Sequence, residues 1–141
     1  MLAAAQVRAH VAGLLAAMPG APTVQTGRYH PVAESALPVW LVFIEGDDIE
    51  LTDIHYPSEE EHSLRISVDA LLRDVPGIEA ALDAAEAAAM AALFAAQPLH
   101  QLQCIGTERL PQREGSAAVA VLRLRLIATF HTLQGDPQTI L

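Results

Sequence analysis

The chain of 141 residues has no lysine and only one cysteine. Cys104 has no partner within the chain, which excludes an intramolecular disulfide, and its place in an apolar segment predicts a small buried side chain. All eight basic residues are arginines, and they stand against 17 acids, which gives a net charge of −9. A chain this acidic repels phosphates, so we do not expect it to bind nucleic acid by bulk attraction.

Long hydrophobic runs are also missing, although 52% of the residues are hydrophobic and only 18% are charged. No run reaches the roughly 18 residues that a membrane-spanning helix needs, and the richest stretch, residues 80–96, is interrupted by Asp83 and Glu86. Arg8 and His10 interrupt the apolar N-terminal stretch, which we interpret as an amphipathic helix of a cytoplasmic protein rather than a signal peptide. The excess of apolar residues is therefore expected in the core and, in part, in contacts between subunits.

The clearest pattern present is a strict alternation over residues 117–132, AAVAVLRLRLIATFHT. A period of two over this length predicts a long strand with one face in the core. The other face mixes β-branched apolar residues with Arg123 and Arg125. That face is a candidate surface for another chain to cover.

Similar patterns predict the other elements. Residues 39–44 are continuously apolar, which favours a central strand covered on both faces. Strands mostly follow one another through turns rather than alternating with helices, so we expect one α+β domain over residues 1–141, a mostly antiparallel mixed sheet packed against two helices. The expected helices are 2–17 and 78–96, the expected strands 24–27, 39–44, 48–54, 62–72, 101–109 and 117–132, and the expected loops and turns 28–37, 46–47, 56–61 and 111–116.

The residue types that carry catalysis or bind metals form no recognisable constellation. The six histidines are scattered, and HExxH, GxSxG, GxGxxG and phosphate-loop motifs are absent. His55 and His62 flank the run Glu59, Glu60 and Glu61, which we interpret as a solvated loop rather than a metal site. The sequence therefore predicts no catalytic residue, no metal and no cofactor.

Arg123 and Arg125 are the candidates for contact with another chain. They stand two residues apart on a strand and project from the same face about 7 Å apart. One interpretation is an ordinary surface on which Arg65 and Asp69 pair across strands. The other is an interface with carboxylates of a neighbouring copy, because the guanidinium fork binds carboxylates in a bidentate way. The candidate interface residues on this second interpretation are Arg123, Arg125 and Arg65, with Asp47, Asp48, Glu50 and Asp53 as the acidic counterpart. These acids lack the glycine placement and terminal glutamate of a calcium loop.

Four segments in order resemble the tail terminator proteins of long-tailed phages, the minor tail protein U group of lambda-like viruses. The likeness covers nearly the full length and consists of element order and local composition rather than rigid motifs. The segments are the N-terminal helix ending in PG with the VxTG strand after it, LPVWLVFIEGDDIEL, HSLRISVDALLRD leading into a helix near Pro76, and AVLRLRLIATFHTLQGDP.

The resemblance implies a tail-terminator-like single domain and a structural protein of the virion tail, made in the cytoplasm of the bacterial host, that is not an enzyme. It implies a homo-hexameric ring that binds the end of the growing tail tube, stops its polymerisation and supplies the head-joining surface. The implied partners are other copies of the chain, the tail tube protein and the head–tail connector or neck protein. No membrane is implied, and DNA is met only in passage through the lumen.

An acidic lumen suits a channel through which DNA slides without sticking. On that hypothesis Glu59, Glu60 and Glu61 are candidate pore-facing acids. The alternatives are another neck or baseplate adaptor, a small-ligand-binding or enzymatic α+β domain, and a dimeric module of host origin.

Overall fold

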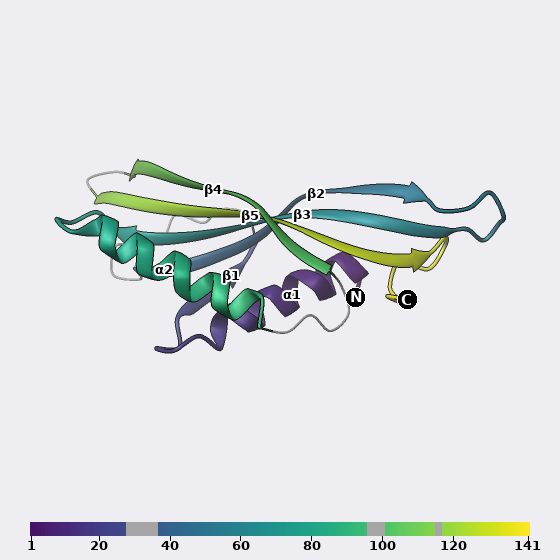
Figure 1. The fold of residues 1–141 in the computed structure, drawn as a ribbon, viewed down its shortest axis with the longest axis horizontal. Helices are drawn as coiled ribbons and strands as arrows, with labels where there is room; N and C mark the ends of the chain where they lie inside the picture. Colours follow the sequence, from purple (N-terminus) through teal and green to yellow (C-terminus); the bar gives the residue numbers. More distant parts are fainter. Residues whose placement is uncertain (28–36, 96–100, 115–116) are drawn as a thin grey trace.

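The computed structural model describes residues 1–27, 37–95, 101–114 and 117–141, with residues 111–114, 117 and 118 described by their backbone alone. Within these residues five strands form one sheet in the order β1-β2-β3-β5-β4, and two helices accompany it (Figure 1). β1 is parallel to β2, and the other pairs are antiparallel. The predicted α+β class is confirmed. The elements are α1 (Ala3–Ala16), β1 (Thr23–Thr26), β2 (Val39–Leu51), β3 (Glu59–Arg73), α2 (Ile78–Leu93), β4 (Gln101–Glu114) and β5 (Ala117–Leu133).

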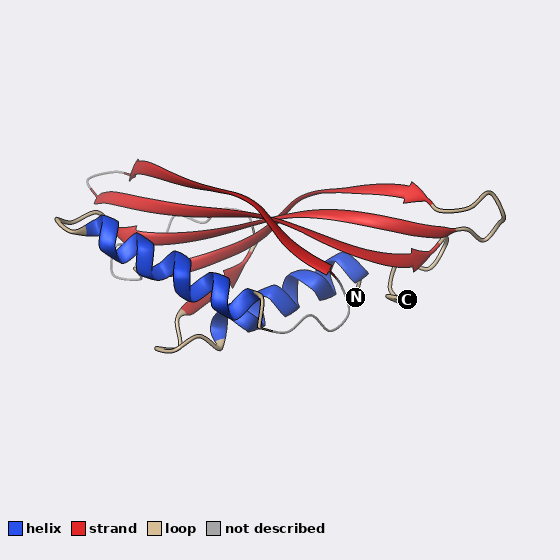
Figure 2. Cartoon of the chain, viewed as in Figure 1, coloured by secondary structure: helices blue, strands red, loops and turns tan. Residues whose placement is uncertain are grey.

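Both helices cover the same face of the sheet, which we call the helix face (Figure 2). Each helix buries one stripe of side chains there at a spacing of three or four residues. Alternate residues of β3 and β5 form the other wall of this core, as the two long alternating patterns predicted. Its most deeply buried members include Val7, Val11, Leu15, Leu93, Leu64, Ile66, Val68, Leu122, Leu124 and Leu126.

A second, smaller apolar cluster lies on the opposite face of the sheet. Residues 39–43 of β2 are all buried, so alternate residues of this strand enter each cluster. This confirms the expected central strand covered on both faces. The members of the second cluster are Val39, Leu41, Phe43, Leu71, Val119 and Val121.

Arg109 of the edge strand β4 connects the sheet to α2. Its guanidinium lies 2.6 Å from a carboxylate oxygen of Asp83 and 2.8 Å from one of Glu79. The hydrogen bond that Arg109 donates to Asp83, together with the one that it donates to Glu79, raises the pKa of Arg109 above its ordinary value. The acidic side of α2 therefore faces Arg109, whose contacts hold the helix against the sheet edge.

The expected turn at residues 46–47 is wrong, because β2 continues to Leu51 through a β-bulge. Its register with β3 shifts between Ile44 and Gly46. A bulge reverses which residues face which way, so Asp47, Ile49 and Leu51 take the helix face after the shift. A Cβ at position 46 would overlap the guanidinium of Arg65, which is the flexible end of a half-exposed side chain and would have to shift.

A second bulge occurs at the same level on β4, between Cys104 and Gly106. Bulges increase local twist, and the sheet is sharply twisted where both strands bulge (Figure 1). The row between the two bulges crosses four strands through the register partners Ile44, Ile66, Leu126 and Cys104.

Beyond this row the sheet extends past the helices as an arm, which we define as residues 46–65 and 127–133, with residues 52–58 as its tip (Figure 1). The expected loop at 56–61 is wrong in its second half, because β3 begins at Glu59. The expected turn at 111–116 is also wrong over 111–114, which belong to β4. Pro111 lies in an edge strand, where prolines within sheets are found. The expected loop at 28–37 lies outside the described residues except for Leu37.

Candidate interaction surface

Exposed apolar side chains gather at the arm. Ile54 and Tyr56 at its tip are 97% and 82% exposed, and Ile49 and Leu51 on its helix face are more than half exposed. The alternation around residue 50 thus predicted a strand correctly, but the apolar side of this strand is exposed at Ile49 and Leu51, because the helix-face core reaches only the base of the arm. Among the described residues, eight of ten exposed large hydrophobic side chains lie on the arm or beside it: Ile49, Leu51, Ile54, Tyr56, Leu133, Met1, Leu2 and Leu141.

The termini belong to this end of the molecule. The backbone N–H of Leu141 donates to the carbonyl of His131 in the arm, and that of Ala3 donates to the carbonyl of Pro137. Figure 1 shows both ends of the chain beside the base of the arm. The exposed apolar residues of the termini therefore continue the surface of the arm.

The arm is also the most acidic part of the chain. Residues 45–61 hold eight of the 17 acids and no arginine. Register places Glu50 directly opposite Glu61, which is an unfavourable like-charge pair in isolation. Two histidines, one on each face of the arm, lie among these carboxylates.

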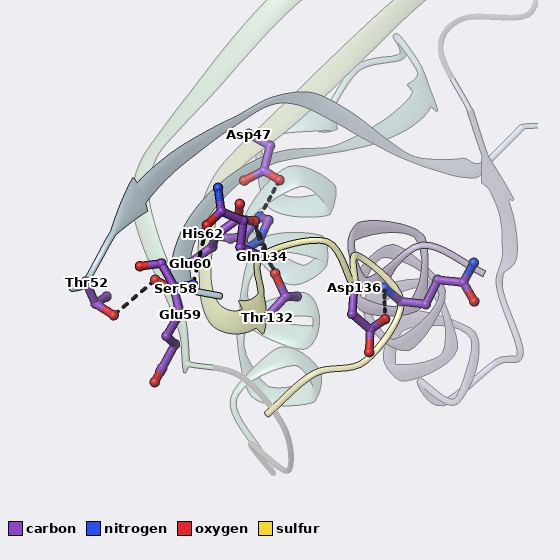
Figure 3. A network of polar contacts seen from close by, with 10 residues as sticks. Asp47, Thr52, Ser58, Glu59, Glu60, His62, Thr132, Gln134 and Asp136 are labelled. Carbon is purple, nitrogen blue, oxygen red and sulfur yellow. Dashed lines mark hydrogen bonds and ion pairs between the residues drawn. The ribbon is translucent and has the colours of Figure 1, made fainter. Parts of the chain in front are cut away.

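His62 organises the helix face of the arm (Figure 3). Its Nδ1 lies 2.7 Å from a carboxylate oxygen of Asp47, and its Nε2 lies 2.8 Å from the hydroxyl of Thr132 and 3.7 Å from a carboxylate oxygen of Glu60. The imidazole is buried and stacks on Phe130 with ring centroids 4.6 Å apart. The network ties β2, β3 and β5 together.

His131 holds the opposite face. Its Nε2 lies 3.2 Å from a carboxylate oxygen of Glu61, and its Nδ1 lies 3.7 Å from one of Glu59. Glu59 and Glu61 therefore share this face, whereas Glu60 points to the helix face beside His62. The three acids predicted to face a pore do not lie on one surface, because they belong to a strand and not to a loop.

The tip is held by its own hydrogen bonds. The hydroxyl of Ser58 donates to the backbone carbonyl of Asp53 at 2.7 Å, and the Asp53 carboxylate accepts from the backbone N–H of His55 at 2.8 Å. Ser58 and Gln134 connect the tip to the end of β5 (Figure 3). Asp53, a predicted interface residue, thus shapes the tip. Side chains of the tip, Leu51 and Gln134 line a hollow of about 440 Å³.

The predicted arginines all contact carboxylates of their own chain. Arg123 binds Asp69, while Arg125 contacts Glu108 and Arg65 contacts Asp48. One interpretation expected Arg65 and Asp69 to pair across strands, and each does so, Asp69 with Arg123 and Arg65 with Asp48. Contact with a neighbouring copy remains a prediction for Arg65 and Arg125, whose side chains are half exposed.

Sequence reasoning missed the network of His62, Asp47 and Thr132. Its members are 15 and 70 residues apart in sequence, and only the bulge and the strand register bring them together. The alternation in β3 put His62 on the core face, which is the one signal that the sequence carried.

No model of a known protein family matches the chain, and no curated protein matches it either. In the described part of the chain no helix has the length and apolar character to cross a membrane. Over the same residues no three histidine, cysteine or acidic side chains are grouped so that they could hold a metal ion.

Proposed function

We propose that this protein is a tail terminator of a long-tailed phage. It assembles as a homo-hexameric ring on the end of the tail tube, stops polymerisation and presents the surface that joins the filled head. The observation that carries the proposal is the arm. It is an extended sheet segment that projects from the helix-covered body, and apolar side chains of the arm itself are exposed. The order of sequence segments that resembles tail terminators supports it.

Apolar patches of this kind on soluble proteins mark places where another chain binds. Five apolar side chains of the arm and three from the chain termini beside it are exposed, so a partner that covers this end would bury them. A protein that ends a polymer needs such a surface, because it must bind subunits already in place. The eight acids of residues 45–61 favour a partner whose surface is positively charged.

The acids of the arm also suit a lumen through which DNA passes. Glu59 and Glu61 share the opposite face of the arm with Glu50, which is the register partner of Glu61. We therefore assign the pore-facing role to Glu59 and Glu61, and not to Glu60. A structure of the ring that puts this face on the outside would contradict the assignment.

The test is to mix the purified chain with the tail tube protein encoded near its gene while tubes polymerise. Negative-stain images should show single caps on tube ends, and tubes should become shorter as the ratio of the chain to tube protein rises. A matched control is Val75→Ser, which changes an exposed apolar residue away from the arm. Tubes of unchanged length with bare ends would overturn the proposal. Binding only to finished tubes, without an effect on length, would indicate a neck adaptor instead.

A further inference from the structure

The outer edge of β2 has no partner strand along the arm, where β2 forms one margin of the sheet (Figure 1). β1 pairs with β2 only as far as Val42, and no described strand pairs with that side of β2 beyond it. Residues 46–51 stay in unbroken register with β3 on their other side, and residues 48–51 are all exposed. We call residues 46–51 the open edge.

On the far side of the sheet the edges are occupied or interrupted. The carbonyl of His131 in β5 accepts a hydrogen bond from the backbone N–H of Leu141. The outer edge of β4 is interrupted by its bulge between Cys104 and Gly106 and by Pro111, and both features hinder the addition of a strand. The open edge is therefore the longest regular stretch of unpaired strand in the part of the chain that the structure describes.

One hydrogen bond determines which backbone groups of the open edge point outward. The N–H of Thr52 donates to the carbonyl of Glu59 at 2.9 Å, in the same register as the ladder of β2 and β3. In an antiparallel ladder, residues that bond across it alternate with residues that do not. The N–H and C=O groups of Asp47, Ile49 and Leu51 therefore point away from β3. They offer three donors and three acceptors to a strand laid along the edge.

The side chains of the open edge are sorted by face. Ile49 and Leu51 lie on the helix face and are 52% and 57% exposed. Asp48 and Glu50 lie on the opposite face, and both are exposed. Successive side chains of an added strand would alternate in the same way, so that every second one lies beside the apolar pair and the others lie beside the acidic pair.

On its opposite face the arm holds more acids than cations. Four carboxylates lie there, and the cations that contact them are one arginine, Arg65, and one histidine, His131. The side chain of Glu50 makes no ion pair or hydrogen bond with any described residue, and its register partner is Glu61. A basic side chain beside Glu50 would offset this like-charge pair. The four acids are Asp48, Glu50, Glu59 and Glu61.

This chain does not itself supply a basic strand for the open edge. Arginines two residues apart occur in it only at Arg123 and Arg125, and β5 is already paired on both sides there. The open edges of two copies repel each other, because each carries the same acids. The occupant is therefore a different protein.

We propose that the open edge binds an extended segment of another protein, with alternating basic and apolar residues, by adding it to the sheet as a strand. The backbone of the segment bonds the outward groups of Asp47, Ile49 and Leu51. Its apolar side chains pack on Ile49 and Leu51, while its basic side chains reach Asp48 and Glu50. In this mode of recognition the main-chain bonds give affinity and the alternate side chains give specificity. The inference goes beyond the proposed function and does not depend on it.

A synthetic peptide of alternating arginine and valine, with blocked ends, tests the binding mode. Two N-methylated forms keep its charge: one is methylated on every valine nitrogen and the other on every arginine nitrogen. The methyl groups of the two forms lie on opposite edges of the peptide strand. Because strand addition uses one edge of the peptide, one form should bind like the parent peptide and the other at least tenfold more weakly by calorimetry. Attraction by charge alone would treat both forms equally.

Matched variants of the chain test the same edge from the other side. Ile49→Pro removes an N–H that points away from β3, so the chain should fold while its affinity for the peptide falls at least tenfold. Ile49→Thr keeps this N–H and should lose less. Glu50→Gln should weaken binding, whereas Asp74→Asn, an exposed acid beyond the other end of β3, should not. Circular dichroism and melting curves check that each variant is folded.

Amide exchange followed by nuclear magnetic resonance reads the edge directly. In the free chain the N–H groups of Ile49 and Leu51 should exchange faster than those of Asp48 and Glu50, and the parent peptide should slow the first two. Equal affinity of the two methylated peptides, or normal binding by a folded Ile49→Pro variant, would overturn the proposal. So would the absence of any binding, which would mean that the acids only protect the edge from pairing.

Discussion

Arg123 of β5 binds both carboxylate oxygens of Asp69 on β3, with Nε and Nη2 each 2.9 Å from one oxygen. The two residues are register partners, and Asp69 is 5% exposed. The hydrogen bonds that Arg123 donates to Asp69 raise the pKa of Arg123 above its ordinary value, against the lowering effect of partial burial. The pKa of Arg123 is higher in the folded than in the unfolded state. The contribution of this shift to the free energy of unfolding is therefore fully present at any pH below the unfolded pKa, and it is lost only as pH rises through the folded pKa. The arginine is therefore charged throughout the physiological range.

Asp69→Ala should lower the free energy of unfolding by about 3 kcal/mol, because it leaves a partly buried guanidinium without its partner. The paired replacement Asp69→Leu with Arg123→Met should recover most of this loss, since it removes both buried charges. The half-exposed Arg125 gives the control, and Arg125→Met should cost less than about 1 kcal/mol. Urea denaturation measures all three. A cost for Asp69→Ala no larger than that for Arg125→Met would contradict the role assigned to the pair.

His62→Ala should loosen the arm before it affects the body. The change removes the ring stacked on Phe130 and leaves Asp47 and Thr132 without their common partner. Local opening is governed by such local contacts, so hydrogen exchange should speed up over residues 46–51 and 59–65 and stay slow in α1 and α2. His62→Phe keeps the ring but not the hydrogen bonds, and should give an intermediate rate. Uniformly faster exchange along the whole chain would show that the network does not act locally.

Two glycines should respond in opposite directions to alanine. Gly13 lies on the exposed side of α1 with open space around its Cβ position, so Gly13→Ala should stabilise the protein by about 0.5–1 kcal/mol. Gly77 precedes α2 with a φ of +85°, where an L side chain is strained even though space is open. Gly77→Ala should therefore cost about 1–2 kcal/mol. Urea denaturation of the two variants gives the sign directly, and the same sign for both would refute the conformational argument at Gly77.

Serine at the exposed tip should separate association from folding. The double variant Ile54→Ser with Tyr56→Ser should keep its stability within about 1 kcal/mol, at about 0.5 kcal/mol per exposed site. Its capping of tail tubes should weaken at least tenfold, while Val75→Ser caps tubes normally. Negative-stain images and tube lengths measure the difference. Capping that is indifferent to the tip variant would exclude the tip from the contact with the tube.

The sequence by itself determined the elements and the fold class. The alternating patterns of residues 62–72 and 117–132 became β3 and β5, and the apolar stripes became α1 and α2. These features depend on local periodicity, which a single chain segment carries. The end of α1 before Pro19 and the start of α2 after Gly77 are local in the same way.

Only the tertiary structure decided how the arm is built and what it exposes. The segment at Gly46 has the composition of a turn, yet it forms a bulge because β3 offers a partner over the full length. The same bulge sets Asp47 against His62. The alternation at Ile49 and Leu51 predicts that one side of the strand is apolar. Whether a helix covers that side depends on how far α1 and α2 extend along the sheet. Burial is a property of the packed chain, and no local pattern contains it.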